Sequence, residues 1–88
     1  MRSEGFRRVG VRHAPETLQP GVLYVSAEYG TALHLCACGC KGEVATPLRP
    51  KDPLGWTLAE VTLRPCIGNQ RWPCGSHYYI TDGRVEWL

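Results

Sequence analysis

A run of alternating cysteines, Cys36, Cys38 and Cys40, is the feature that most constrains how this chain can fold. Cysteines this close cannot easily cross-link to one another, because a disulfide requires Cα atoms about 4.4–6.8 Å apart and a specific torsion angle. They can converge on a metal ion where the backbone curls, and Gly39 provides the conformational freedom for such a turn. The run therefore indicates a metal site and not a disulfide framework.

The fourth ligand of such a site is expected further along the chain. Cys74 stands between Pro73 and Gly75, residue types that favour a tight turn. Two cysteine-bearing turns placed face to face form a tetrahedral thiolate site, and zinc is the usual metal in one. Buried or redox-active thiols are the alternative, and the spacing does not match the common iron–sulfur patterns. The predicted zinc ligands are Cys36, Cys38, Cys40 and Cys74.

The size of the chain also favours a metal. Its 88 residues make one domain, whose core alone would contribute little stability. We see no apolar run long enough to span a membrane and no secretory signal. We therefore expect a cytoplasmic protein, in which clustered cysteines bind metal more often than they form disulfides. The formal charge of +2 is weak, so neither a membrane nor a nucleic acid is an expected partner.

The composition predicts a mostly β protein. Seven prolines and ten glycines indicate many turns and short strands. We predict a small antiparallel β-fold with a cysteine-knuckle zinc site, divided into a basic N-terminal arm over 1–20 and a zinc-binding β domain over 21–88. The arm is expected to contain one brief strand near 6–11. Further strands are expected over 21–26, 31–36, 43–48, 56–63 (as one strand, or two with a kink near Glu60), 76–80 and 84–88, with a structured loop over 64–73.

Three side chains outside the cysteine run allow more than one interpretation. Strand alternation places His34 on the same face as Cys36, so His34 is expected near the metal. His77 fits a zinc ligand, a catalytic group or a structural histidine equally well. Cys66 is better interpreted as a small buried residue than as a ligand or a reactive thiol.

Ser76 is a candidate nucleophile with no obvious base beside it. Neighbours on a strand point to opposite faces, so His77 cannot readily deprotonate Ser76 without a bulge. A base from another strand, such as His34 or Glu43, is more plausible, and spacing alone favours Ser76 as an ordinary turn-to-strand residue. Asn69 and Trp72 lie in the loop that leads to the last cysteine turn, where we expect substrate contact.

Three motifs together resemble a known family. They are residues 34–40 (HLCACGC), residues 64–69 (RPCIGN) and residues 73–80 (PCGSHYYI) with the terminal 82–87 (DGRVEW). The resemblance covers about residues 20–88. The family consists of small bacterial domains encoded beside ubiquitin-like proteins and relatives of their activating and conjugating enzymes.

The resemblance implies a zinc site on the four cysteines and a functional pair formed by Ser76 and His77. Some family members resemble peptidases that act on the ubiquitin-like partner. This chain departs from the family pattern twice. It has Lys41 where a glycine usually follows the last knuckle cysteine, and Cys66 where the family tends to have serine, so Cys66 is not expected to be a shared ligand.

The function implied by this resemblance is a zinc-stabilised peptidase that cleaves at the C-terminus of a ubiquitin-like protein. Ser76 would be the nucleophile, and His77 or His34 the base or orienting group. The alternative is a non-catalytic zinc-knuckle adaptor that binds the ubiquitin-like protein or its conjugation enzymes. A zinc hydrolase is a third interpretation, but four thiolates leave no open position on the metal.

Overall fold

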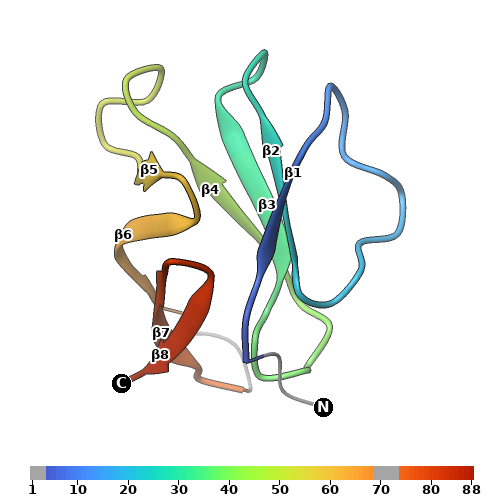
Figure 1. Cartoon of the computed structure of the whole chain (residues 1–88), viewed down its shortest axis with the longest axis vertical. Helices are drawn as coiled ribbons and strands as arrows, with labels where there is room; N and C mark the ends of the chain where they lie inside the picture. Colours follow the sequence, from blue (N-terminus) through green and yellow to red (C-terminus); the bar gives the residue numbers. More distant parts are fainter. Residues whose placement is uncertain (1–3, 69–73) are drawn as a thin grey trace.

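The chain folds into two four-stranded β-sheets (Figure 1). The structure, a computed structural model, describes residues 4–68 and 74–88, and within these ranges every regular element is a strand. This confirms the predicted mostly β class. The first sheet contains β1 (Arg7–Gly10), β2 (Val22–Ser26), β3 (Thr31–Leu35) and β4 (Glu43–Pro47), and the second contains β5 (Thr57–Ala59), β6 (Thr62–Gly68), β7 (His77–Thr81) and β8 (Arg84–Trp87).

The strands follow one another in order within each sheet. Every neighbouring pair is antiparallel except β1 and β2, which run parallel. The β7–β8 hairpin turns at Asp82 and Gly83, whose φ angles of 48° and 79° are the left-handed pair that a tight hairpin needs. No helix in the described part of the chain is long and apolar enough to cross a membrane.

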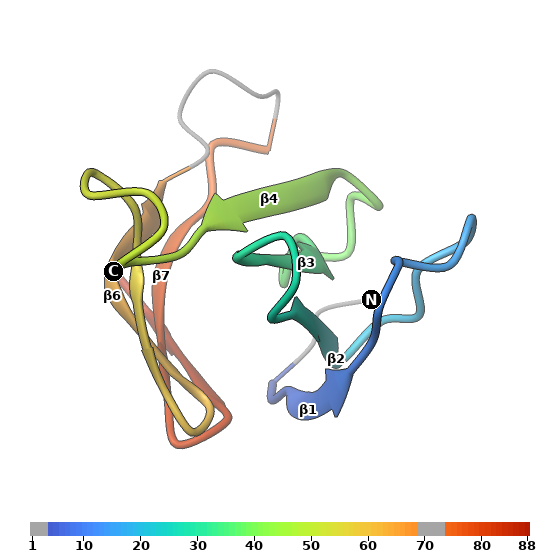
Figure 2. The same cartoon turned by 90° about the horizontal axis from the view of Figure 1, so that it is seen from above.

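The two sheets pack face to face, and the core lies between them (Figure 2). Strand alternation turns Leu23 and Val25 of β2 inward from one side, and Leu63 and Ile80 from the other. Among the described residues, Tyr78 on β7 is the largest side chain that is fully buried. The core is continuous from sheet to sheet, so a side chain on β3 can reach one on β7.

The N-terminal segment packs both against the core and against the outer face of the first sheet. The brief strand predicted near residues 6–11 is confirmed as β1, and Phe6 before it lies in the core. The Phe6 amide donates a hydrogen bond to the Gly83 carbonyl at 2.6 Å, which joins the edges of the two sheets. Leu18 packs with Val22 and Tyr24 on the outer face of the first sheet. Both faces of β2 are therefore covered.

The segment between residues 56 and 68 differs in part from the prediction. Residues 56–63 form two strands, with a turn at Glu60, whose φ is 55°. The predicted loop over 64–73 is wrong for its first half, because β6 continues to Gly68. The pairing of β6 with β7 shifts register between Leu63 and Ile67, and Pro65 lies in this irregular stretch, where the inward alternation is interrupted and Pro65 is exposed. Residues 69–73 lie outside the described residues.

Candidate functional site

The knuckle, residues 36–42, is a tight turn between β3 and β4. The Cys36 amide donates to the Gly42 carbonyl at 2.8 Å, and the Gly39 amide donates to the Cys36 carbonyl at 3.1 Å. Gly39 has a φ of 91° and Lys41 a φ of 66°, so the backbone enters the left-handed region twice within three residues. These two reversals curl the backbone and bring the knuckle cysteines to one side.

Lys41 occupies a position that suits glycine better. A side chain with a Cβ atom is disfavoured in the left-handed region, whereas glycine adopts it without a steric penalty. The φ of 66° at Lys41 therefore gives a physical reason for the glycine that usually follows the last knuckle cysteine in the family resembled by this chain.

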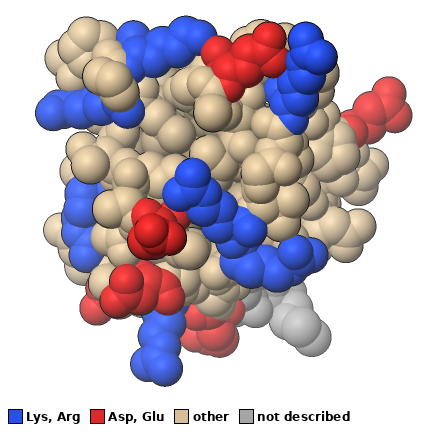
Figure 3. Space-filling view, turned by 45° about the horizontal axis from the view of Figure 1, so that its top comes forward, with Lys and Arg blue, Asp and Glu red and all other residues tan. Residues whose placement is uncertain are grey.

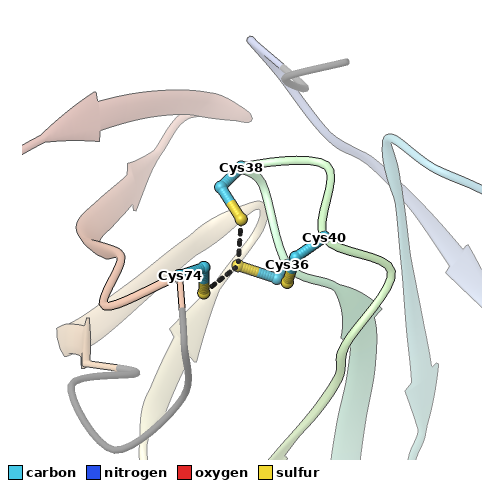
Figure 4. Close-up of side chains that lie close together, drawn as sticks. All are labelled: Cys36, Cys38, Cys40 and Cys74. Atoms are coloured by element: carbon cyan, nitrogen blue, oxygen red, sulfur yellow. Dashed lines mark hydrogen bonds between the residues drawn. The ribbon is translucent and has the colours of Figure 1, made fainter.

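The structure brings the four predicted ligands together. The Sγ atoms of Cys36, Cys38, Cys40 and Cys74 all lie within 4.8 Å of one another. Cys36 Sγ is 3.4 Å from Cys38 Sγ and 4.0 Å from Cys74 Sγ, and the four side chains converge as Figure 4 shows. A tetrahedral ion with metal–sulfur bonds of 2.3 Å would place its sulfurs about 3.8 Å apart. The cluster therefore has the size and the donor set to hold a metal ion.

Ser76 belongs to the surroundings of this cluster. Its Oγ lies 2.9 Å from Cys36 Sγ and 3.4 Å from Cys74 Sγ, and its side chain is buried. The hydrogen bond from Ser76 lowers the pKa of Cys74 to about 6. The pKa of Cys38 is raised to about 12, mainly by desolvation and to a smaller extent by its hydrogen bond with Cys36. The Cys74 thiolate is thus stabilised without a cation, whereas the ionisation of Cys38 is opposed. A bound divalent cation would allow both thiols to ionise.

His34 lies in the core and not at the surface. It is 0% exposed, and its Nε2 is 2.8 Å from the hydroxyl of Tyr78, which also accepts a hydrogen bond from the Ala37 amide at 3.3 Å. Burial lowers the pKa of His34 to about 4 and raises that of Tyr78. A neutral His34 therefore helps to connect β3, the knuckle and β7. Its role as a catalytic base stays a prediction, and its burial weighs against that role.

His77, the first residue of β7, points to the opposite face of the sheet from Ser76, which directly precedes the strand. Ser76 and Tyr78 are buried, and His77 between them is half-buried. Its Nε2 lies 2.8 Å from the Sγ of Cys66, on the neighbouring strand β6. Cys66 is itself half-buried, not fully buried as the sequence interpretation preferred. Sequence reasoning missed this pair because it interpreted Cys66 as part of a loop.

The two residues predicted to contact substrate, Asn69 and Trp72, lie outside the described residues. Gly75, just before Ser76, is exposed and has a φ of 54°, and a Cβ atom built on it would meet none of the described residues within 4 Å.

Comparison with known proteins identifies one matching family model. Its description is "Bacterial ubiquitination-like system serine protease (BubE)", and it matches residues 10–88. The matched range includes the knuckle, Cys66 and the turn with Cys74. No curated protein and no solved structure matches the chain.

Proposed function

Because the chain belongs to the serine protease family of bacterial ubiquitination-like systems, we propose that it is a zinc-stabilised peptidase that cleaves at the C-terminus of a ubiquitin-like protein. The family resemblance expected from the motifs is confirmed by the match over residues 10–88. The cleavage reaction, its substrate and the identity of the metal are what we propose beyond family membership.

In this proposal the zinc ion has a structural role. Four cysteine ligands close the coordination sphere of zinc and leave no position for a catalytic water. The ligands join the knuckle to the segment that enters β7, and Cys38 and Cys74 pack against the core. The metal would thus stabilise a small core and fix the start of β7. The bond-breaking chemistry must then come from side chains outside the cluster.

The observation that carries the proposal is the position of His77. Its imidazole lies three residues after Cys74, at the first position of β7, and is half-buried instead of enclosed. Its Nε2 is within hydrogen-bond distance of the Cys66 thiol, a group that can act as a nucleophile. A histidine that is partly accessible, anchored on a strand and paired in this way is suited to be a general base.

Ser76 is the nucleophile predicted from the sequence, but its contacts favour a supporting role. Its hydroxyl lies against the sulfurs of Cys36 and Cys74 and can donate a hydrogen bond to a metal-bound thiolate. Such a bond orients a ligand and tunes its charge. Ser76 would then support catalysis by holding the cluster that fixes β7.

A non-catalytic adaptor is the second candidate, and a hollow on the molecule favours it. The hollow has a volume of about 500 Å³ and is lined by Arg8, Arg49 and Lys51 together with the apolar Val25 and Leu48. Basic and apolar side chains together suit a partner segment that carries acidic and apolar residues. The face shown in Figure 3 carries both signs of charge, with Asp and Glu among Lys and Arg.

Incubation with a ubiquitin-like protein from the same system, carrying a short C-terminal extension, separates the two candidates. We expect the zinc-loaded parent to remove the extension, and His77→Ala to be slower by roughly 10²–10⁴-fold, the usual contribution of a general base. His13→Ala, at an exposed histidine, is the matched control and should cleave like the parent. Binding without cleavage by the parent would support the adaptor and refute the peptidase.

A further inference from the structure

Cys66 is the cysteine that lies outside the four-sulfur cluster. The cluster contains Cys36, Cys38, Cys40 and Cys74, whereas the Sγ of Cys66 lies 2.8 Å from the Nε2 of His77. This distance is within the range expected of a hydrogen-bonded nucleophile and base. The same residue type therefore occurs in two chemical environments in one small domain.

The sheet register explains why the two side chains meet. Ile67 of β6 and Tyr78 of β7 are register partners, and both are buried in the core. Their neighbours Cys66 and His77 consequently lie on the other face of the sheet. The register shift between Leu63 and Ile67 makes β6 irregular just before this point, and such irregularities commonly redirect a side chain beside an active site.

The pair is positioned where a substrate can reach it. Cys66 and His77 are each half-buried, in contrast to Ser76 and His34, which are buried on the core side. Both residues of the pair lie on paired strands, and the cluster holds the segment that precedes His77. Strands fix the geometry of reacting groups more precisely than loops do.

We propose that Cys66 is the nucleophile of this chain and His77 its general base, so that the peptidase acts through a thioester. The assignment rests on the proposed function for its peptide substrate, and on the contact between Cys66 and His77 for its chemistry. The family is described as serine proteases, so this chain would carry out the same class of reaction with sulfur in place of oxygen.

The reaction proceeds in two balanced steps. The Cys66 thiol gives its proton to His77 Nε2, and the sulfur attacks the carbonyl carbon of the scissile amide. The tetrahedral intermediate collapses, the C–N bond breaks, and the leaving amine takes the proton from His77. Water then attacks the thioester and gives a proton to His77. The C–S bond breaks, the carboxylic acid is released, and the proton returns to the sulfur.

Alkylation of the zinc-loaded full chain with iodoacetamide tests the pair independently of turnover. We expect a single fast adduct, located on Cys66 by peptide mapping, because coordinated thiolates are shielded by their metal. His77→Ala should slow this alkylation at least tenfold, since the thiol loses the base beside it. His13→Ala should leave the rate unchanged. An alkylation rate that does not depend on His77 would overturn the inference.

Cleavage of the extended ubiquitin-like protein tests the catalytic role. Cys66→Ala should lose turnover while it keeps its zinc and its melting temperature. Cys66→Ser should keep the fold and lose the iodoacetamide adduct, and it should retain measurable cleavage, because it restores the residue type that the family tends to have at this position. Parent-like cleavage by Cys66→Ala would refute Cys66 as nucleophile and leave the peptidase function standing. Absence of cleavage by the parent would refute the peptidase function, and the alkylation result would still decide the reactivity of the pair.

Discussion

The four-cysteine cluster and the Cys66–His77 pair show how neighbouring groups determine what a cysteine can do. In the cluster, Cys36 is 2% exposed and lies among three other sulfurs, an arrangement suited to binding a cation. In the pair, one half-buried sulfur lies beside an imidazole nitrogen, an arrangement suited to proton transfer. Sulfur donors without an imidazole favour coordination, and a single sulfur with an imidazole favours nucleophilic chemistry.

The start of β7 connects the two regions. Ser76 faces the cluster and His77 faces Cys66, because successive residues of a strand point to opposite faces of the sheet. The two sites therefore share a backbone segment but not their side chains. Substitutions at one site should leave the chemistry of the other intact unless they unfold the segment between them.

The largest expected difference is in folding. Cys74→Ser removes one of four ligands, and structural zinc contributes on the order of 10 kcal/mol in small domains, which is comparable to the whole stability of a domain. We expect this variant to lose cooperative thermal melting, measured by circular dichroism. Cys66→Ser is the matched control and should melt nearly like the parent. Equal damage from the two substitutions would mean that the four ligands are wrongly assigned.

Ser76→Ala separates a nucleophile from a group that supports the metal. If Ser76 acts through its contacts with Cys36 and Cys74, its loss should weaken zinc binding by roughly 10–100-fold. Cleavage should then persist at saturating zinc. Competition with a chromophoric chelator measures the affinity, and the cleavage assay measures the rate. Unchanged zinc affinity together with abolished cleavage would contradict this account and favour the serine nucleophile.

The buried hydrogen bonds of Tyr78 should contribute less. Tyr78→Phe leaves His34 Nε2 and the Ala37 amide without their shared partner in the core, at a cost of about 2 kcal/mol in the free energy of unfolding. The control is Tyr79→Phe, one residue along the same strand and half-buried, which should change stability by less than about 0.5 kcal/mol. Urea denaturation measures both. A larger loss at Tyr79 would show that the connection through His34 is unimportant.

The smallest expected effect is a gain in stability. Lys41→Gly should raise the free energy of unfolding by up to about 1 kcal/mol, because glycine adopts the φ of 66° without strain. Lys41→Ala keeps a Cβ atom at this position and serves as the control. Thermal melting of the zinc-loaded variants checks the difference. A gain of the same size in both variants would trace the effect to loss of the lysine side chain and not to the backbone.

The sequence was sufficient to predict the cluster and most strands because their signals are local. The spacing of the knuckle cysteines and the alternation around His34 each depend on a few neighbouring residues. The pair between Cys66 and His77 depends on the register shift in β6, which no local pattern reveals. Pro65 also suggested a loop where the strand continues, so the base beside Cys66 could not be predicted.

Native mass spectrometry of the intact chain after brief treatment with iodoacetamide tests the division between the two regions most directly. We predict one dominant species, with one zinc ion retained, one added carbamidomethyl group, and no further modification. This result would place four cysteines on the metal and leave Cys66 alone as the reactive thiol. A species with zinc and no adduct, or one with several adducts and no metal, would contradict that division.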